Sequence, residues 1–321
     1  MSQDNQSTIL VTGAAGFIGS HVSEALTARG DRVVGLDNFD PFYDPAAKRQ
    51  NLAGLLADER FEFIEGDIRD IEALARIFDD RNIDGVIHLA ARAGVRPSIA
   101  DPVGYVSTNV EGTVSLLEAA RCAGVQRFVF GSSSSVYGAA NKVPFSEDQR
   151  IDRPISPYAA TKVAGEAHCY THHYLYGLPI VVLRFFTVYG PRQRPDLAIN
   201  KFVRLLEAGE PIPQFGDGSS SRDYTFIGDI VRGVVAAYDS ELTLEIINLG
   251  SSSPIRLDEM IQAVADAVGV EAQVEIMENQ PGDVPRTYAN VDKAAQLLDW
   301  EPRFTLAEGL AEFVKWARER S

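Results

Sequence analysis

The sequence TILVTGAAGFIG, residues 8–19, sets a short run rich in β-branched residues directly before a glycine-rich loop. After the loop, apolar residues recur at helical spacing until Gly30, a residue suited to ending a helix. Glycines between a strand and a helix permit a tight turn and let the backbone approach a pyrophosphate, whose charge faces the helix N-terminus. This stretch therefore predicts the first strand–helix unit of a Rossmann fold that binds a dinucleotide.

An acidic residue follows at the spacing that such a fold requires. Asp37 ends the second β-branched run, roughly 20 residues after the glycines, where a carboxylate binds the adenosine ribose hydroxyls. That carboxylate would repel a 2′-phosphate, and Asn38 and Phe39 supply no compensating arginine, so the expected cofactor is NAD rather than NADP. The alternative, in which the glycines only pack a helix against a strand, is disfavoured by the strand–loop–helix context.

Apolar, β-branched runs alternate with helical patterns through the first part of the chain. The runs are residues 8–12, 32–37, 61–65, 85–90, 127–132 and 179–186. Buried strands that alternate with helices predict an α/β fold, a Rossmann-type doubly wound parallel sheet covered on both faces.

The pattern changes after Gly190, where four prolines and the flexible run 216–221 predict a smaller C-terminal lobe. We expect a Rossmann domain over 1–189, joined by parts of 222–250 and 284–292, and the lobe mainly over 190–321.

The charge and composition exclude several kinds of partner. The net charge of −15 at pH 7 disfavours nucleic acid and anionic membrane surfaces, because the overall field repels phosphates. No apolar run is long enough to span a bilayer, and the polar residues 1–7 do not resemble an export signal. Two cysteines are too few for a disulfide framework or a thiolate metal cage. We therefore expect a cytoplasmic protein.

Three histidines, His168, His172 and His173, lie close together in a segment expected to be helical. Two histidines four residues apart on a helix can share a metal ion. We nevertheless expect no metal site, because no third ligand is apparent in the sequence and the histidines lie far along the helix from Tyr158.

Tyr158 and Lys162 stand four residues apart near the start of a predicted helix that runs to about residue 176. This spacing places the phenol and the ammonium on one face of the helix. A phenol with a pKa near ~10 is a poor base at neutral pH, but an adjacent ammonium and a cationic nicotinamide both favour its anion. Tyr158 can then accept a hydroxyl proton while hydride leaves the same carbon.

Such a pair occurs often by chance, and a serine run supports its interpretation as a reacting centre. The fifth β-branched run leads into SSSSVYG, residues 132–138. A strand end delivers these hydroxyls to the crevice at the carboxyl edge of the sheet, whereas the alternative is a flexible loop. The residues predict hydride removal from a secondary alcohol, with Tyr158, Lys162 and Ser133 at the chemical centre.

The glycine loop, the serine run before Val136-Tyr137-Gly138 and the Tyr158/Lys162 pair together resemble the extended short-chain dehydrogenase/reductase family. The resemblance covers essentially the whole chain. It implies a Rossmann domain, tightly held NAD, and nucleotide-sugar substrates bound mainly by the C-terminal lobe. It also implies that Ser133 hydrogen-bonds the reacting oxygen.

The two residues after Ser133 indicate which reaction of this family to expect. In the nucleotide-sugar 4,6-dehydratases these positions carry an acidic pair that eliminates water, and the uronate decarboxylases keep a glutamate at the second. This chain has Ser134 and Ser135 there. Neutral hydroxyls cannot serve as that acid and base, which leaves oxidation and re-reduction of one carbon, an epimerisation.

The most specific resemblance is to the UDP-glucuronate 4-epimerases. It lies in DNFDPFYDP (37–45), AGVR (93–96), RFFTVYGP (184–191), RPD (194–196) and PGDVP (281–285). Thr187 and Gln280 point the same way, because hexose 4-epimerases usually have asparagine and arginine at these positions. The implied reaction inverts C4 of a UDP-sugar through a transient 4-keto intermediate, taking UDP-glucuronate to UDP-galacturonate.

Two alternatives stay open from the sequence. Within the enzymes, the chain could be a UDP-glucose or UDP-N-acetylglucosamine 4-epimerase. From another class, a non-catalytic NAD-sensing protein would keep the glycine loop and lose the Tyr158/Lys162 pair, which this chain retains.

The strand ends and the resemblance together give the expected ligand-binding residues. Those for the cofactor are Gly13, Gly16, Phe17, Ile18, Gly19, Asp37, Asn38, Asp67, Ile68, Leu89, Ala90, Ala91, Asn109, Tyr158 and Lys162. Those for the UDP-sugar are Ser133, Ser134, Ser135, Thr187, Arg194, Asn200, Lys201, Gln214, Phe215, Arg222 and Asp283. Arg96 and Arg286 are weaker candidates, because each could instead form an ion pair at the surface. A sugar carboxylate needs hydroxyl and guanidinium donors, which Ser134, Ser135, Thr187 and Arg194 can provide.

The resemblance also implies a homodimer. In the family, the helices that match residues 105–123 and 157–176 pack against their copies as a four-helix interface.

Overall fold

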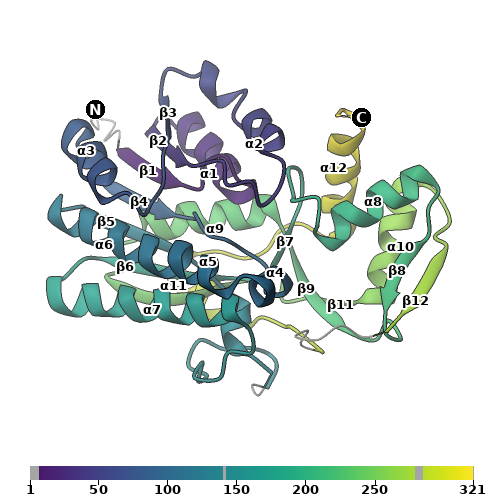
Figure 1. The fold of residues 1–321 in the computed structure, drawn as a ribbon. Helices are drawn as coiled ribbons and strands as arrows, with labels where there is room; N and C mark the ends of the chain where they lie inside the picture. The colour runs from purple at the N-terminus through teal and green to yellow at the C-terminus, as the bar shows by residue number, and fades with distance from the viewer. Residues whose placement is uncertain (1–6, 140–141, 279–284, 321) are drawn as a thin grey trace.

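The computed structural model describes residues 7–139, 142–278 and 285–320, and its centre is a seven-stranded parallel sheet (Figure 1). The strand order is β10-β6-β5-β4-β1-β2-β3. The strands are β1 (Thr8–Thr12), β2 (Arg32–Asp37), β3 (Phe61–Glu65), β4 (Gly85–His88), β5 (Arg127–Ser133), β6 (Ile180–Phe185) and β10 (Leu244–Leu249). The doubly wound parallel sheet predicted from the apolar runs is confirmed.

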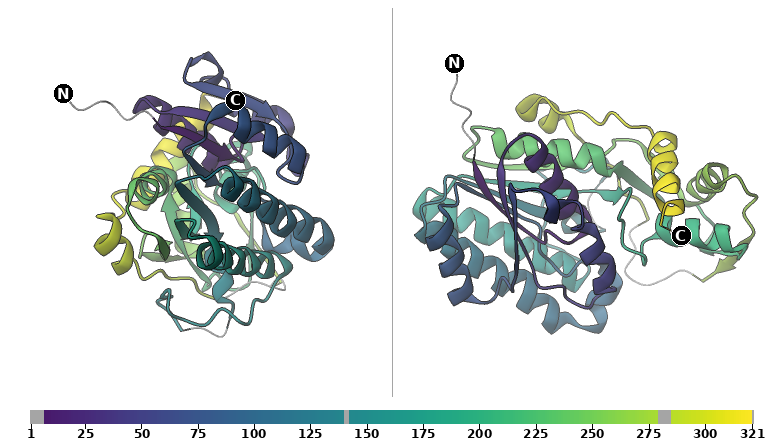
Figure 2. Two further views of the ribbon diagram at one scale, coloured as in Figure 1. Left: turned by 90° about the vertical axis from the view of Figure 1, so that its left-hand side faces the viewer. Right: turned by 90° about the horizontal axis from the view of Figure 1, so that it is seen from above.

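Helices cover both faces of this sheet (Figure 2). On one face α1 (Phe17–Ala28) packs beside α9 (Ile227–Asp239), and on the other lie α3 (Ile71–Arg81), α6 (Gly112–Cys122) and α7 (Pro157–Tyr176). Within β1, Ile9 and Val11 join the first layer while Leu10 joins the second. The strands are buried on both sides, which explains why they read as continuous apolar runs.

The order of the strands reverses between β1 and β4. The chain runs outward from β1 through β2 to β3 and then returns to place β4 on the other side of β1. The loops that follow β1 and β4 therefore diverge, and a crevice opens between them at the carboxyl ends of the strands.

The helix expected over 105–123 is interrupted. The chain forms α5 (Pro102–Val106), then a π-helical turn (Ser107–Glu111), then α6. The turn holds the buried Asn109, whose side chain accepts from the Arg92 backbone N–H at 2.8 Å and donates to the Arg92 carbonyl at 2.9 Å. Asn109 also donates to the Thr161 hydroxyl at 3.0 Å, so it fixes the loop after β4 against α7. π-turns often mark such functional positions.

Later parts of the chain build a smaller lobe beside the sheet (Figure 1). Its elements are β7 (Thr187–Tyr189), β9 (Ser221–Phe226) and β11 (Pro254–Arg256) in one sheet, the pair β8 (Ile212–Phe215) and β12 (Val274–Met277), and the helices α8 (Ala198–Ala208), α10 (Leu257–Val268) and α12 (Leu306–Arg318). The division of the chain at residues 189 and 190 stays a prediction.

Candidate active site

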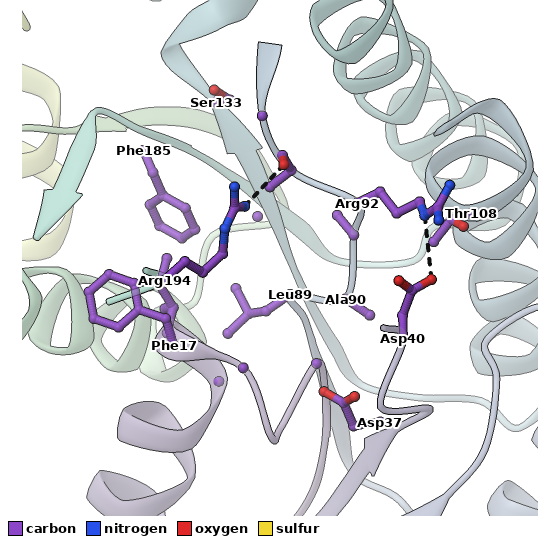
Figure 3. A pocket seen from close by; sticks show the side chains of 18 of the residues that line it. Phe17, Asp37, Asp40, Leu89, Ala90, Arg92, Thr108, Ser133, Phe185 and Arg194 are labelled. Carbon is purple, nitrogen blue, oxygen red and sulfur yellow. Dashed lines mark hydrogen bonds and ion pairs between the residues drawn. The ribbon is translucent and has the colours of Figure 1, made fainter. Parts of the chain in front are cut away.

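A cavity of about 350 Å³ lies at the carboxyl ends of the central strands (Figure 3). Thirteen of the fifteen residues expected to bind the cofactor line it. They are Gly13, Gly16, Phe17, Ile18, Gly19, Asp37, Asn38, Ile68, Leu89, Ala90, Ala91, Tyr158 and Lys162. The fold thus brings the glycine loop, the acidic strand end and the Tyr158/Lys162 pair to one cavity.

The glycine positions of the loop leave no room for a Cβ atom. Gly13 has a φ of +72°, and a Cβ there would lie 2.8 Å from the backbone nitrogen of Ala90. A Cβ on Gly19 would lie 2.1 Å from the Gly13 carbonyl oxygen. Among the described residues, no side chain caps the N-terminus of α1, so its first N–H groups stay available to an anion.

Asp37 is buried at the end of β2 and braces the loop. Its carboxylate accepts from the backbone N–H groups of Phe39 at 2.9 Å and Ala15 at 3.2 Å. Burial raises the pKa of Asp37 above its ordinary value, and the charge of Lys48 opposes that rise.

Lys48 is a residue that the sequence analysis missed. It belongs to α2 (Pro45–Asn51), lines the cavity, and places its Nζ 4.0 Å from an Asp37 carboxylate oxygen and 3.0 Å from the Asp40 carbonyl oxygen. The Tyr43 ring centroid lies 4.8 Å from the same Nζ. No spacing rule marks a lysine at this distance from a strand end, so only the fold identifies it.

Asp67 and Asn109, the other two residues expected to bind the cofactor, bond to residues around the cavity. Asp67 accepts a hydrogen bond from the Asn38 side chain at 2.9 Å and pairs with Arg69 at 2.7 Å. The hydrogen bond from Arg69 lowers the pKa of Asp67 to about 2. The Asn109 side chain is hydrogen-bonded to Arg92 and Thr161, so it links the loop after β4 to α7.

The reacting centre sits at the first turns of α7. The helix begins after Ser156, whose hydroxyl accepts from the Ala159 N–H at 3.1 Å, and Pro157 occupies its first position. Tyr158 and Ser133 both line the cavity, and the Lys162 Nζ donates to the Gly131 carbonyl at 2.7 Å. The end of β5 and the start of α7 therefore place the three predicted catalytic residues together.

Burial dominates the electrostatics of this centre. It raises the pKa of Tyr158, and a hydrogen bond with Ser133 and the charge of Arg194 oppose that rise. Burial also lowers the pKa of Lys162 to about 8, against the opposing charge of Glu166. The influence of Arg194 on Tyr158 was not predicted, because the sequence analysis assigned this arginine only to the sugar.

A second cavity of about 720 Å³ continues from the first into the lobe. The two share Gly94, Thr187, Arg194 and Leu197 in their walls. Of the residues expected to bind substrate, Arg96, Thr187, Arg194, Lys201, Phe215 and Arg222 line the second cavity, and the Arg96 guanidinium lies 5.1 Å from the Phe215 ring centroid. Volumes of this size suit nucleotide-sized ligands.

The remaining expected substrate residues have other surroundings. Ser134 and Ser135 belong to a 3₁₀ turn (Ser134–Tyr137), and the Ser135 hydroxyl donates to the Ser133 hydroxyl oxygen at 2.9 Å. Asn200 is buried and donates to the Gln193 carbonyl at 2.6 Å, and Gln214 is buried in β8. Asp283 and Gln280 lie outside the described residues. The backbone of Arg286 forms an isolated β-bridge with Ser221 in β9, and its Cζ lies 5.7 Å from the Tyr288 ring centroid.

Two of the three histidines considered as metal ligands have protein partners. His172 is 2.8 Å from a Glu118 carboxylate oxygen, and His173 is 3.0 Å from the Leu178 carbonyl. Within 7–139, 142–278 and 285–320, no three His, Cys, Asp or Glu residues form a group that could hold a metal ion. Over the same residues, the structure contains no helix long and apolar enough to cross a membrane.

Comparisons with known proteins agree with this geometry. The sequence model of the GDP-mannose 4,6-dehydratase family matches residues 10–313. A UDP-glucuronate 4-epimerase of Thermodesulfobacterium geofontis is 45% identical over 311 residues, which cover 97% of this chain and 96% of that protein. The crystal structure of UDP-glucuronic acid 4-epimerase from Bacillus cereus, in complex with UDP-glucuronic acid and NAD, has a TM-score of 0.92 and 38% identity and covers 98% of this chain and 100% of that chain.

A UDP-glucose 4-epimerase from Thermotoga maritima, solved with UDP-glucose, is also similar, with a TM-score of 0.91 and 33% identity over 98% of this chain and 99% of that chain. The fold and the site define a Rossmann enzyme of the extended short-chain dehydrogenase/reductase class. Within that class, the chain belongs to the GDP-mannose 4,6-dehydratase family.

Proposed function

We propose that this chain is an NAD-dependent 4-epimerase that interconverts UDP-glucuronate and UDP-galacturonate. The observation that carries the proposal is the continuous cleft in which Tyr158 and Ser133 face a shared wall containing Thr187 and Arg194. The similarity to proteins named UDP-glucuronate 4-epimerase supports it. A UDP-glucose 4-epimerase has a similar TM-score, so the fold alone does not distinguish between these two sugar substrates.

The first cavity fits NAD by its shape and donors. The glycine loop excludes side chains where the diphosphate would approach the uncapped N-terminus of α1, and Asp37 stands where the adenosine ribose hydroxyls would bind. When bound, NAD accepts hydride from C4 of the sugar and later returns it. Lys48 and Lys162 supply positive charge within the same walls.

The protein's own residues handle the proton. Tyr158 takes the proton of the C4 hydroxyl as the alcohol becomes a ketone, and it gives that proton back when C4 is reduced again. Ser133 donates to the sugar oxygen in both steps, and Ser135, bonded to it at 2.9 Å, keeps its hydroxyl in place. The 4-keto sugar turns within the cleft between the two steps, so hydride returns to the opposite face and C4 is inverted.

The carboxylate must be controlled during this time. A 4-keto uronate is a β-keto acid. It can lose carbon dioxide when the bond between C5 and the carboxylate carbon aligns with the π system of the C4 ketone. We assign Thr187 and Arg194 in the shared wall, with Ser134 in the neighbouring turn, to holding the carboxylate away from that alignment.

The substrate is tested by presenting purified protein with UDP-glucuronate, UDP-glucose and UDP-N-acetylglucosamine in parallel and following the C4 configuration by NMR. We expect efficient epimerisation of the uronate alone. Preferential turnover of UDP-glucose or UDP-N-acetylglucosamine would show that UDP-glucuronate is not the main substrate.

We further propose that the protein is a homodimer. Tyr170 and Tyr174 stack on the outer face of α7, and Tyr174 is 74% exposed. Val103 in α5 is 78% exposed. Large apolar side chains gathered on adjacent helices indicate a surface that another copy covers.

Light scattering at micromolar concentration should give the mass of two chains. Replacing Tyr170 and Tyr174 with glutamate should give the mass of one, because two charges would enter an apolar contact. Ile276→Glu, a change at a similarly exposed position in β12, is the control and should leave the dimer intact. A wild-type protein that is monomeric would contradict the proposal.

A further inference from the structure

Three separate parts of the chain meet at the guanidinium of Arg194. Its Nε and Nη2 donate to the two carboxylate oxygens of Asp196 at 3.0 and 2.7 Å. Its Nη1 donates to the Ala93 carbonyl at 3.0 Å (Figure 3). The ring centroid of Phe42 lies 4.8 Å from its Cζ. The guanidinium is thus fixed by the segment after β2, the loop after β4 and its own loop.

The pairing with Asp196 removes most of the net charge of Arg194. The Arg194 side chain is 12% exposed, and that of Asp196 is 46% exposed. Burial disfavours both charges, but their mutual hydrogen bonds raise the pKa of Arg194 and lower the pKa of Asp196. Both groups are therefore ionised at neutral pH, and the pair is close to neutral.

The guanidinium still has donors for a ligand. It carries five N–H groups, and the two bonds to Asp196 and the one to Ala93 use three of them. A sugar carboxylate in the cleft would therefore meet two free N–H groups on an arginine whose charge is already compensated. Such a contact orients the carboxylate with less attraction than an unpaired arginine would exert.

This balance matters because the sugar has to move. In an epimerase of the kind proposed above, the 4-keto ring turns between the two hydride transfers, and its carboxylate moves with it. An arginine that held the carboxylate with its full charge would stabilise one orientation and slow the turn.

Resting on that proposed function, we propose that Asp196 is a positioning residue that competes with the substrate carboxylate for Arg194, so that the sugar is bound loosely enough to turn. Asp196 does not touch the reacting atoms. It acts by setting how strongly Arg194 binds.

The test compares steady-state kinetics of the NAD-containing wild-type enzyme and Asp196→Asn with UDP-glucuronate. The amide keeps the size of the side chain and removes its charge, so Arg194 should bind the carboxylate more tightly. We expect KM to fall about 3- to 10-fold and kcat to fall about 10-fold, because the enzyme would bind the substrate more tightly in its ground state and turn it over more slowly. Asp196→Glu, which keeps the charge, should restore both values towards those of the wild type.

Two controls separate this effect from structural damage. The affinity for UDP, which has no sugar carboxylate, should be unchanged in Asp196→Asn. Asp58→Asn removes an exposed carboxylate with the same bidentate pairing to an arginine two residues away, Arg60, and should change neither constant.

The outcomes distinguish the two proposals. If the wild-type enzyme epimerises UDP-glucuronate and Asp196→Asn shows a raised or unchanged KM, the role of Asp196 is overturned and the proposed function stands. If the wild-type enzyme does not epimerise UDP-glucuronate, the proposed function fails and the role of Asp196 fails with it.

Discussion

Replacing Tyr158 with phenylalanine should lower the turnover of UDP-glucuronate by about 10²- to 10⁴-fold, the range that general acid–base groups contribute. The change removes one hydroxyl and keeps the ring, which packs edge-on against Tyr105 with centroids 6.3 Å apart. Hydride cannot leave C4 easily while the hydroxyl proton stays on the oxygen. Ser133 and Lys162, which line the first cavity with Tyr158, also carry exchangeable protons, but a neutral hydroxyl is a weaker base than a phenolate and Lys162 is bonded to Gly131.

The measurement for Tyr158→Phe is kcat by NMR, with bound dinucleotide and melting temperature recorded on the same sample. Both of these should match the wild type, because the phenol hydroxyl is not needed for folding. Tyr170→Phe makes the same change on the exposed face of the same helix and should keep full activity. Near-normal turnover in Tyr158→Phe would show that another group is the base.

Removing the Arg194 side chain should weaken use of the uronate and change the products. Hydrogen bonds to charged groups contribute about 1.5–3 kcal/mol, so Arg194→Ala should lower kcat/KM for UDP-glucuronate roughly 10- to 100-fold. The carboxylate would then reach the alignment with the C4 ketone that favours loss of carbon dioxide. We therefore expect a decarboxylated UDP-4-keto-pentose beside the epimer, in an amount limited by the bound cofactor, because each molecule of the ketone leaves one NADH behind.

Product NMR and release of labelled carbon dioxide measure this second prediction. Arg256→Ala is the matched control, because Arg256 pairs with Asp258 in the same bidentate manner but is exposed. Unchanged uronate kinetics together with a single epimeric product would show that Arg194 does not hold the carboxylate.

The parts of the site that the sequence predicts are those set by local spacing. The glycine loop and Asp37 are identified because a turn between a strand and a helix demands particular residues at particular positions. Tyr158 and Lys162 are identified because four residues span one helical turn. The strands are identified because burial on both faces makes each a continuous apolar run.

The parts that the sequence does not predict depend on contacts between distant segments. Lys48 approaches Asp37 because α2 folds back over the loop, and no local rule gives that path. Arg194 contacts Phe42 and Ala93, which lie in separate loops about 150 and 101 residues earlier in the chain. The π-helical turn directs the Asn109 side chain to Arg92 and Thr161, contacts that the sequence does not predict, and its role at the cofactor stays a prediction.

The central claim is that C4 is oxidised and reduced again within one site, by a cofactor that the protein already holds. The direct measurement uses UDP-glucuronate with deuterium at C4, incubated with purified protein without added NAD and followed by proton NMR. UDP-galacturonate should accumulate to equilibrium with deuterium retained at C4, because the same hydride leaves and returns. Protons from solvent at C4 of the product, or a requirement for added NAD or NADP, would show that the hydride does not stay within one site.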